Sequence, residues 1–154
     1  GVMDHKYIFT NLGYNLKPLD FQGAIGLAQM GKVDEIHVKR RNAKKVLTEM
    51  IEDILDVYVP KELPDAETSW FGTPIICENK EYKTNLVNHL EKNKVQTRNY
   101  FAGNILLHPG YSNLDKWGDY PLSNEVLDRV FFIGAAPHYT DKVFEYIKGV
   151  IKDF

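Results

Sequence analysis

The chain has 154 residues, a length that suits one compact domain or a small domain with an appended arm. Its net charge of −2 gives no electrostatic reason to expect a nucleic acid or an anionic membrane as partner. The single cysteine, Cys77, excludes an intrachain disulfide and fits a reducing compartment. No apolar stretch approaches the ~20 residues needed to span a bilayer, so we expect a cytoplasmic protein.

A first helix is expected from Pro18 onwards, with the proline in its first turn, where a missing N–H costs nothing. Phe21, Ile25 and Ala28 recur at helical spacing. Gly23 and Gly26 make this helix unusually small-sided, although glycine costs a helix interior up to about 1 kcal/mol relative to alanine. The pattern therefore indicates a close approach by another backbone, either an adjacent helix or a second subunit.

After Gly31, which could break or merely bend the helix, apolar residues between Val33 and Ile54 recur at three- and four-residue steps and predict a long amphipathic helix. The basic residues between 39 and 45 are offset by nearby acids, and we interpret them as a solvated helix face. The proline-containing segment 59–65 predicts a linker.

From residue 69 the pattern changes to that of a small α/β unit. Strands are expected over 70–77, 95–100 and 130–133, with helices over 82–93 and after Thr140, which is placed to cap the last one. Between the last two strands lies a long polar segment, 103–123. The fold class expected is α/β, or more narrowly α+β: a helical arm followed by a small, mostly antiparallel sheet with helices on one face. Cys77 lies in the apolar run 74–77 and is expected to be a buried, inert thiol.

The sequence contains no self-sufficient catalytic set. None of the five histidines pairs with another histidine, a cysteine or a carboxylate at a spacing typical of metal sites, so no metal site is expected. A Gly-x-Ser-x-Gly motif, a phosphate-cradling glycine loop and a dinucleotide fingerprint are also missing from the sequence.

Two polar clusters are candidate binding sites. In the first, Tyr14, Asn15 and Lys17 follow a glycine and can converge on an anionic oxygen, unless Asn15 merely bonds its own backbone in a turn. In the second, segment 97–104 ends a predicted strand and concentrates a guanidinium, two amides and aromatic rings. That composition suits a sugar or phosphate ligand. The alternative is structural, with Phe101 in the core and Asn104 in a turn.

Taken in order, several segments resemble the sugar-modifying branch of the fold-type I pyridoxal-phosphate enzymes, the DegT/DnrJ/EryC1/StrS family of nucleotide-sugar aminotransferases and their dehydratase relatives. The segments are 4–7, 13–17, 20–29 and 40–42. Segments 69–72 (Ser-Trp-Phe-Gly) and 97–104 (Thr-Arg-Asn-Tyr-Phe-Ala-Gly-Asn) resemble the 4-keto-6-deoxysugar 3-dehydratases in particular. The chain departs from the usual family wording at Gly23, Ala135, Ala136, His138 and Tyr139.

The resemblance covers only the C-terminal part of such an enzyme. It implies that residues 1–58 are a linking segment with long helices that joins a large cofactor-binding domain, and that residues 59–154 form the C-terminal small α/β domain. The aspartate facing the cofactor's pyridine nitrogen, and the lysine or histidine beside its reactive carbon, would lie upstream. The resemblance therefore implies no catalytic residue in this chain, no cofactor bound to it alone, and no activity of the chain by itself.

For the whole protein the resemblance implies a homodimer with pyridoxal or pyridoxamine 5'-phosphate as cofactor and a nucleotide-linked 4-keto-6-deoxysugar as substrate, in lipopolysaccharide or dideoxysugar biosynthesis. Asn15 would reach the cofactor phosphate of the neighbouring subunit. The substrate would be contacted by Tyr14, Lys17, Arg98, Phe101 and Asn104. Pyridoxamine phosphate would condense with the 4-keto group, and loss of a proton would let the 3-hydroxyl leave.

Two alternative functions and one question about the mechanism stay open from the sequence. The generic Gly13-Tyr14-Asn15 motif permits an ordinary sugar aminotransferase, and the missing upstream domain permits a non-catalytic dimerisation or ligand-binding module. Within the dehydratases, a chain with one cysteine does not decide whether an iron–sulfur cluster and a reductase are needed.

Overall fold

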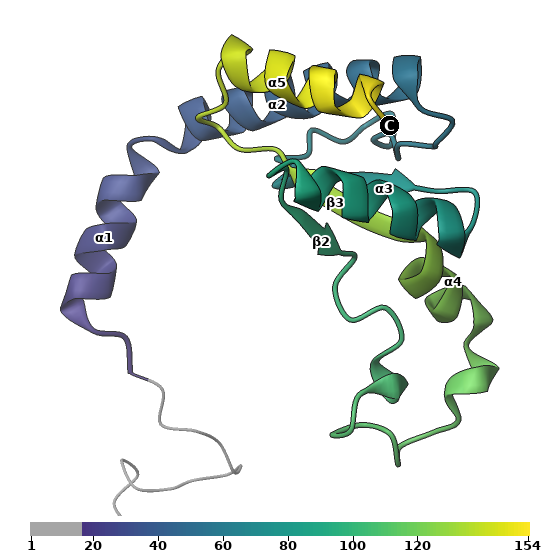
Figure 1. The fold of residues 1–154 in the computed structure, drawn as a ribbon. Coiled ribbons are helices and arrows are strands. Elements are labelled where there is room, and N and C mark those ends of the chain that lie inside the picture. The colour runs from purple at the N-terminus through teal and green to yellow at the C-terminus, as the bar shows by residue number, and fades with distance from the viewer. Residues whose placement is uncertain (1–16) are drawn as a thin grey trace, which may run out of the picture. The chain divides into compact units, whose positions relative to one another are not determined.

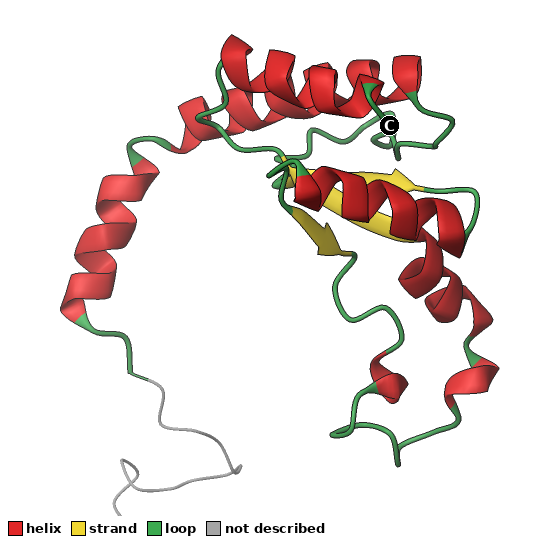
Figure 2. Ribbon diagram, viewed as in Figure 1, coloured by secondary structure: helices red, strands yellow, loops and turns green. Residues whose placement is uncertain are grey.

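A computed structural model describes residues 17–154, which contain five α-helices and a three-stranded sheet (Figures 1 and 2). Contacts divide the chain into two units, residues 1–33 and 34–154. We describe each unit by itself. In the described part of the chain, no helix is both long enough and apolar enough to cross a membrane.

The described part of the first unit consists mainly of helix α1, Asp20–Met30. The expectation that Pro18 lies in the first turn is wrong, because Leu19 is the N-cap and Pro18 precedes it. The Leu19 N–H donates to Oε1 of Gln22 at 2.8 Å, which ties the cap to the first turn. No residue of α1 is buried. The close neighbour expected at Gly23 and Gly26 therefore stays a prediction.

Gly31 and Lys32 form a turn, so the two predicted helices are separate. Helix α2 spans Val33–Ile54 and buries a stripe at the predicted three- and four-residue spacing. The interpretation of the basic residues as a solvated face is wrong for Lys44, which is 7% exposed. Its ammonium donates to Oγ1 of Thr48 at 2.8 Å and to the Pro60 carbonyl at 3.1 Å, and it lies 5.1 Å from the Trp70 ring centroid. These contacts compensate the ammonium for the water it loses.

The sheet has the order β1-β3-β2 and is antiparallel throughout, as predicted. Its strands are β1 (Gly72–Ile76), β2 (Thr97–Asn99) and β3 (Val130–Gly134). Thr73 faces Ile133 and Ile75 faces Phe131 across the β1–β3 ladder. Residues directly opposite one another in an antiparallel pair point to the same face, so these four side chains share the inward face. All four are at most 2% exposed.

Three helices complete the core on that inward face: two were expected there, and the third, α2, was assigned to the arm. They are α2, α3 (Lys80–Lys92) and α5 (Asp141–Lys152), seen beside the sheet in Figure 1. Asn79 caps α3 by accepting from the Tyr82 N–H at 2.9 Å. Thr140 occupies the N-cap position of α5, but its side chain makes no capping hydrogen bond. The core residues are Leu47, Met50, Ile51, Leu55, Val59, Ile75, Cys77, Leu86, Leu90, Val95, Phe131, Ile133, Ile147, Val150 and Ile151.

One helix was not expected: α4, Pro121–Arg129, begins at the end of the polar segment 103–123. Proline at its first position fits the helix start. Contacts from elsewhere hold its C-terminal turn, because the Lys83 ammonium donates to the Leu127 carbonyl at 2.6 Å and Arg129 Nε donates to the Cys77 carbonyl at 2.9 Å. No residue of this nine-residue helix is buried. Two short 3₁₀ turns, Ile105–Leu107 and Trp117–Asp119, interrupt the polar segment before it.

Residues on both sides of the expected domain boundary at residue 59 share one core, since Leu47 and Ile51 pack with Ile75 and Phe131. The division into a linking segment, residues 1–58, and a small domain, residues 59–154, stays a prediction.

The buried thiol generates a first testable prediction. Burial raises the pKa of Cys77 to about 11 from its ordinary value of 9.0. Two pKa units lower the thiolate fraction near neutral pH about 100-fold. We therefore expect Ellman's reagent at pH 8 to react with the folded chain at least about 100-fold more slowly than with the chain in guanidinium. Because Cys77 is the single cysteine, Cys77→Ser supplies the blank. Equal rates in the two solvents would contradict the buried position.

Candidate functional site

The second face of the sheet carries the strongest candidate site. Pro74, Phe132 and Arg98 lie directly opposite one another across the three strands, so they share the face that points away from the core. Arg98 is exposed on β2, and within the described residues no hydrogen bond or ion pair holds its guanidinium. An exposed guanidinium offers five N–H donors in a planar fork that suits phosphate or carboxylate oxygens.

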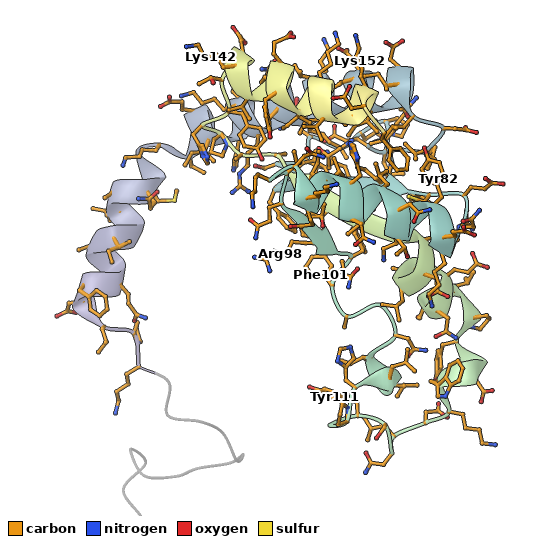
Figure 3. All side chains as sticks on the ribbon, viewed as in Figure 1. Tyr82, Arg98, Phe101, Tyr111, Lys142 and Lys152 are labelled. Atoms are coloured by element: carbon orange, nitrogen blue, oxygen red, sulfur yellow. The ribbon has the colours of Figure 1, made fainter. Side chains whose placement is uncertain are left out.

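Four aromatic rings gather beside Arg98 and form what we call the aromatic patch: Phe71, Tyr100, Phe101 and Phe132. Phe132 is its centre, with ring centroids 5.3 Å from Phe71, 6.2 Å from Phe101 and 6.4 Å from Tyr100. Phe101 is 66% exposed and Phe71 is 52% exposed. The alternative that placed Phe101 in the core is therefore wrong. Figure 3 shows Arg98 and Phe101 at the β2 end of the sheet.

The backbone after β2 is bent sharply so that Phe101 projects outwards. Phe101 has a φ of 52°, a left-handed conformation that L-residues other than glycine, asparagine and aspartate rarely adopt. Its N–H donates to the Asn99 carbonyl at 2.7 Å. Gly103 follows with a φ of 61°, and a Cβ there would lie 2.6 Å from Cβ of Leu127. Only glycine fits at 103, because both the backbone angle and the contact with α4 exclude a side chain.

Asn104 lies at the inner end of this turn rather than on its surface. Its side chain is 3% exposed and caps the first 3₁₀ turn by accepting from the Leu106 N–H at 3.0 Å. Its amide nitrogen donates to the Trp117 carbonyl at 2.9 Å and to Oδ1 of Asn124 at 2.8 Å. This matches the structural alternative, in which Asn104 belongs to a turn. Direct contact between Asn104 and a substrate stays a prediction.

The remaining predicted residues lie at the N-terminal end. Lys17 is exposed in the segment before α1. Tyr14 and Asn15 lie outside the described residues. Lys17 belongs to the first unit and Arg98 to the second, so a common site formed by the two polar clusters stays a prediction.

Glu91, a carboxylate that feels the positive charge of Arg98, is engaged by Thr97. Glu91 accepts from Oγ1 of Thr97 at 2.7 Å. This bond and a second one from the Thr97 backbone hold the pKa of Glu91 below its usual value, and the positive charge of Arg98 adds a smaller contribution. Arg98 therefore keeps its donors available for a ligand.

Other parts of the described chain are weaker candidates for a binding site. A cavity of about 430 Å³ lies beside α2, and it is lined by both cations and carboxylates, including Arg41, Lys44, Glu49 and Glu62. None of the four described site residues lines it. Residues 17–154 contain no group of three or more histidine, cysteine, aspartate or glutamate side chains placed to hold a metal ion.

The aromatic patch contains residues that sequence reasoning did not assign to the site. Phe71 and Phe132 were expected in strands, and nothing local indicates that they meet segment 97–104. Strand geometry places Phe131 and Ile133 on one face and Phe132 on the other, but because all three residues are apolar, the sequence does not indicate which face is the core. The partner strands were needed to identify what lies beside Phe132.

Comparison with known proteins places these features in a family. The profile of the DegT/DnrJ/EryC1/StrS aminotransferase family matches residues 1–152. The chain is 35% identical to the dTDP-4-dehydro-2,6-dideoxy-D-glucose 3-dehydratase of Saccharopolyspora spinosa, over 98% of this chain and 34% of that protein. It is 31% identical to the lipopolysaccharide biosynthesis protein RfbH of Salmonella typhimurium, over 98% of this chain and 36% of that protein. The chain therefore spans about a third of the length of these relatives.

The fold is also that of a solved relative. The Escherichia coli GDP-4-keto-6-deoxy-D-mannose-3-dehydratase with bound hydrated PLP superposes with a TM-score of 0.79 at 23% identity, over 97% of this chain and 39% of that one. At this identity the likeness shows the fold alone, and it confirms the expected fold class.

The close packing beneath the aromatic patch generates a second prediction. A Cβ on Gly72 would lie 2.5 Å from Cδ2 of Phe132 and 3.2 Å from the Ile133 carbonyl oxygen. We expect Gly72→Ala to lower the free energy of unfolding by about 1–3 kcal/mol, because Phe132 must leave its position. Gly149→Ala on α5 is the matched control, since nothing lies within 4 Å of its Cβ. It should be neutral or stabilise by up to about 1 kcal/mol. Equal denaturation midpoints for Gly72→Ala and the unmodified chain would contradict this packing.

Proposed function

Because the chain belongs to the DegT/DnrJ/EryC1/StrS aminotransferase family, we propose that the complete protein is a nucleotide-sugar enzyme, dependent on pyridoxal or pyridoxamine 5'-phosphate, that removes the 3-hydroxyl of a 4-keto-6-deoxysugar. The 3-dehydratase name of the relative at 35% identity supports this choice within the family. The chain would be the C-terminal portion of that enzyme, in lipopolysaccharide or dideoxysugar biosynthesis and in the cytoplasm.

The observation that carries the proposal is the juxtaposition of Arg98 with the aromatic patch. The exposed rings of Phe71 and Phe101 offer apolar surface to a sugar or a base, while the Arg98 guanidinium next to them offers donors to phosphate oxygens. A nucleotide-linked deoxysugar presents both chemistries in one molecule. The proposed role of this chain is to bind and orient that substrate and to exclude water from one side of it.

The cofactor would be held largely outside the described residues. Within residues 17–154, Lys17 is an exposed ammonium two positions after Asn15, and a cation there is compatible with a phosphate nearby. Asn15 would donate its amide to the cofactor phosphate of the neighbouring subunit in a homodimer, with Tyr14 close to the substrate. When bound, the cofactor supplies an electron sink for the carbon atoms next to the 4-keto group. The proton-transfer residue would lie upstream and would be a histidine rather than a lysine.

Two other functions compete with this one. An ordinary sugar aminotransferase is favoured by the family as a whole, whereas segment 97–104 favours the dehydratase. The other is a non-catalytic dimerisation or ligand-binding module, for which the exposed aromatic patch beside Arg98 would suffice.

Product analysis tests the function. We expect the complete protein, given pyridoxamine phosphate and a nucleotide-linked 4-keto-6-deoxysugar, to form a product that lacks the 3-hydroxyl. Parallel reactions with glutamate, and with a reductase and its reductant, cover the two ways of completing the cycle. The present chain alone is the control and should give no product. A product with an amino group at C4 would establish the aminotransferase instead, and binding without conversion in every arm would favour the module.

Asn15 provides a test of the shared site in the complete protein. Asn15→Ala should weaken cofactor retention by about 1.5–3 kcal/mol, the contribution of a hydrogen bond to a charged group. Mixing this variant with a subunit that lacks the upstream histidine should restore partial activity. Each mixed dimer then holds one site with both an intact histidine and an intact partner asparagine. Heterodimers that show no recovery would contradict the contribution of Asn15 across the dimer.

A further inference from the structure

Asn104 joins three segments that are distant in the sequence. Its amide nitrogen reaches the second 3₁₀ turn at the Trp117 carbonyl and helix α4 at Oδ1 of Asn124, at 2.9 and 2.8 Å. The Asn124 amide nitrogen lies 3.4 Å from the same Trp117 carbonyl. We call this arrangement of Asn104, Asn124 and the Trp117 carbonyl the amide clamp. It closes the segment 104–124 at its base.

The segment that the clamp closes has little other support. Residues 111–120 are all exposed, and its apolar side chains Tyr111, Leu114 and Trp117 are 47%, 70% and 55% exposed. Figure 3 shows this excursion extending away from the sheet around Tyr111. A segment with few buried contacts opens locally at low free energy. The hydrogen bonds of the buried Asn104 side chain therefore constrain where the segment begins and ends, together with the bond of the His108 ring to the Ala102 carbonyl at 3.2 Å.

The beginning of that segment is also the turn that displays Phe101. Only Ala102 and Gly103 lie between Phe101 and Asn104, and two of the four residues 101–104 have positive φ. Backbone angles of this kind persist only where the surroundings impose them. Gly103 packs against Leu127 of α4, and Asn124 of the same helix holds Asn104. Helix α4 therefore fixes both the position and the strained conformation of the turn.

The hydrogen bonds of the Asn104 side chain argue against direct ligand binding by this residue. Its amide has two donor hydrogens, and both are directed at protein acceptors. Its carbonyl oxygen accepts from the Leu106 N–H. With 3% of the residue exposed, a ligand would have to displace bonds that the protein already makes.

We propose that Asn104 and Asn124 are positioning residues for the substrate: through the amide clamp they hold Phe101 against Phe71 and Phe132, beside Arg98. This inference rests on the proposed function for the identity of the substrate. The clamp itself consists of hydrogen bonds within residues 104–124. The proposal also assigns a role to Asn124 of helix α4, a residue that the predicted site does not include.

Substitutions at Asn124 in the complete protein test the proposal. Asn124→Ala removes the acceptor of the Asn104 amide. Asn124→Asp keeps an oxygen acceptor there and loses only the longer bond from the Asn124 amide to the Trp117 carbonyl, at 3.4 Å. Asn85→Ala, on the exposed face of α3, is the matched control. We expect Asn124→Ala to raise KM for the nucleotide sugar about 2- to 10-fold, which corresponds to one neutral hydrogen bond. Asn124→Asp and Asn85→Ala should stay within about twofold of the unmodified enzyme, which is below that range.

A double-mutant cycle with Phe101→Ala separates positioning from general stability. If the clamp acts through Phe101, Asn124→Ala should add little to the KM of Phe101→Ala. Effects that multiply would overturn the proposal, as would an unchanged KM for Asn124→Ala. If Asn124→Ala fails to fold, Asn124→Asp and Asn104→Asp carry the test. The Asn104 variant loses both donors of the clamp, so it should raise KM while Asn124→Asp does not, and equal KM values for the two would overturn the proposal.

Failure of the proposed function would look different. In that case Arg98→Ala and Phe101→Ala would leave KM unchanged. Hydrogen exchange of the Leu106 amide would then still report the clamp, with faster exchange expected in Asn124→Ala than in Asn124→Asp. Equal exchange in the two variants would show that the clamp does not exist.

Discussion

The register of β3 between its two neighbours is the constraint on which the second unit depends. Pairing with β1 and β2 sends Phe131 and Ile133 inwards and Phe132 outwards, and a slip of one residue would exchange the two faces. The inward side chains complete the core with α2, α3 and α5. The outward side chain becomes the centre of the aromatic patch. Core and candidate site are therefore two results of the same pairing.

The parts of this arrangement that follow from local pattern were predictable. The apolar stripes of α2 and α5 and the short apolar runs of the strands indicated the elements, and the mixed order of strands and helices indicated the antiparallel sheet. What was not predictable depends on contacts between distant residues. The ammonium of Lys44 is buried because Thr48, Pro60 and Trp70 surround it, and its neighbours in the sequence give no sign of this. Likewise, Lys83 and Arg129 hold the C-terminal turn of α4 through hydrogen bonds to distant segments, which the sequence around α4 does not reveal.

The candidate site shows the same division. The composition of segment 97–104 pointed to a ligand, and Arg98 and Phe101 are indeed exposed there. The same composition could not distinguish Phe101, which projects outwards at a φ of 52°, from Asn104, which is buried in hydrogen bonds to the protein. The family resemblance groups Phe101 and Asn104 as substrate-binding residues. We propose different roles for them: Phe101 contacts the ligand, and Asn104 holds Phe101 in position. The contact of Asn15 with the cofactor phosphate and that of Tyr14 with the substrate stay predictions, because both residues lie outside the described part of the chain.

The central claim is that a nucleotide-linked 4-keto-6-deoxysugar lies against the aromatic patch. Fluorine NMR on the complete protein, with fluorophenylalanine placed at position 101 or at position 154, measures this directly. Phe154 is a suitable reference because it is 42% exposed and packs against Tyr82 and His89, away from the patch. The account predicts that saturating nucleotide sugar shifts the resonance at 101 and leaves the one at 154 unchanged. An unchanged resonance at 101, with binding verified by calorimetry, would contradict it.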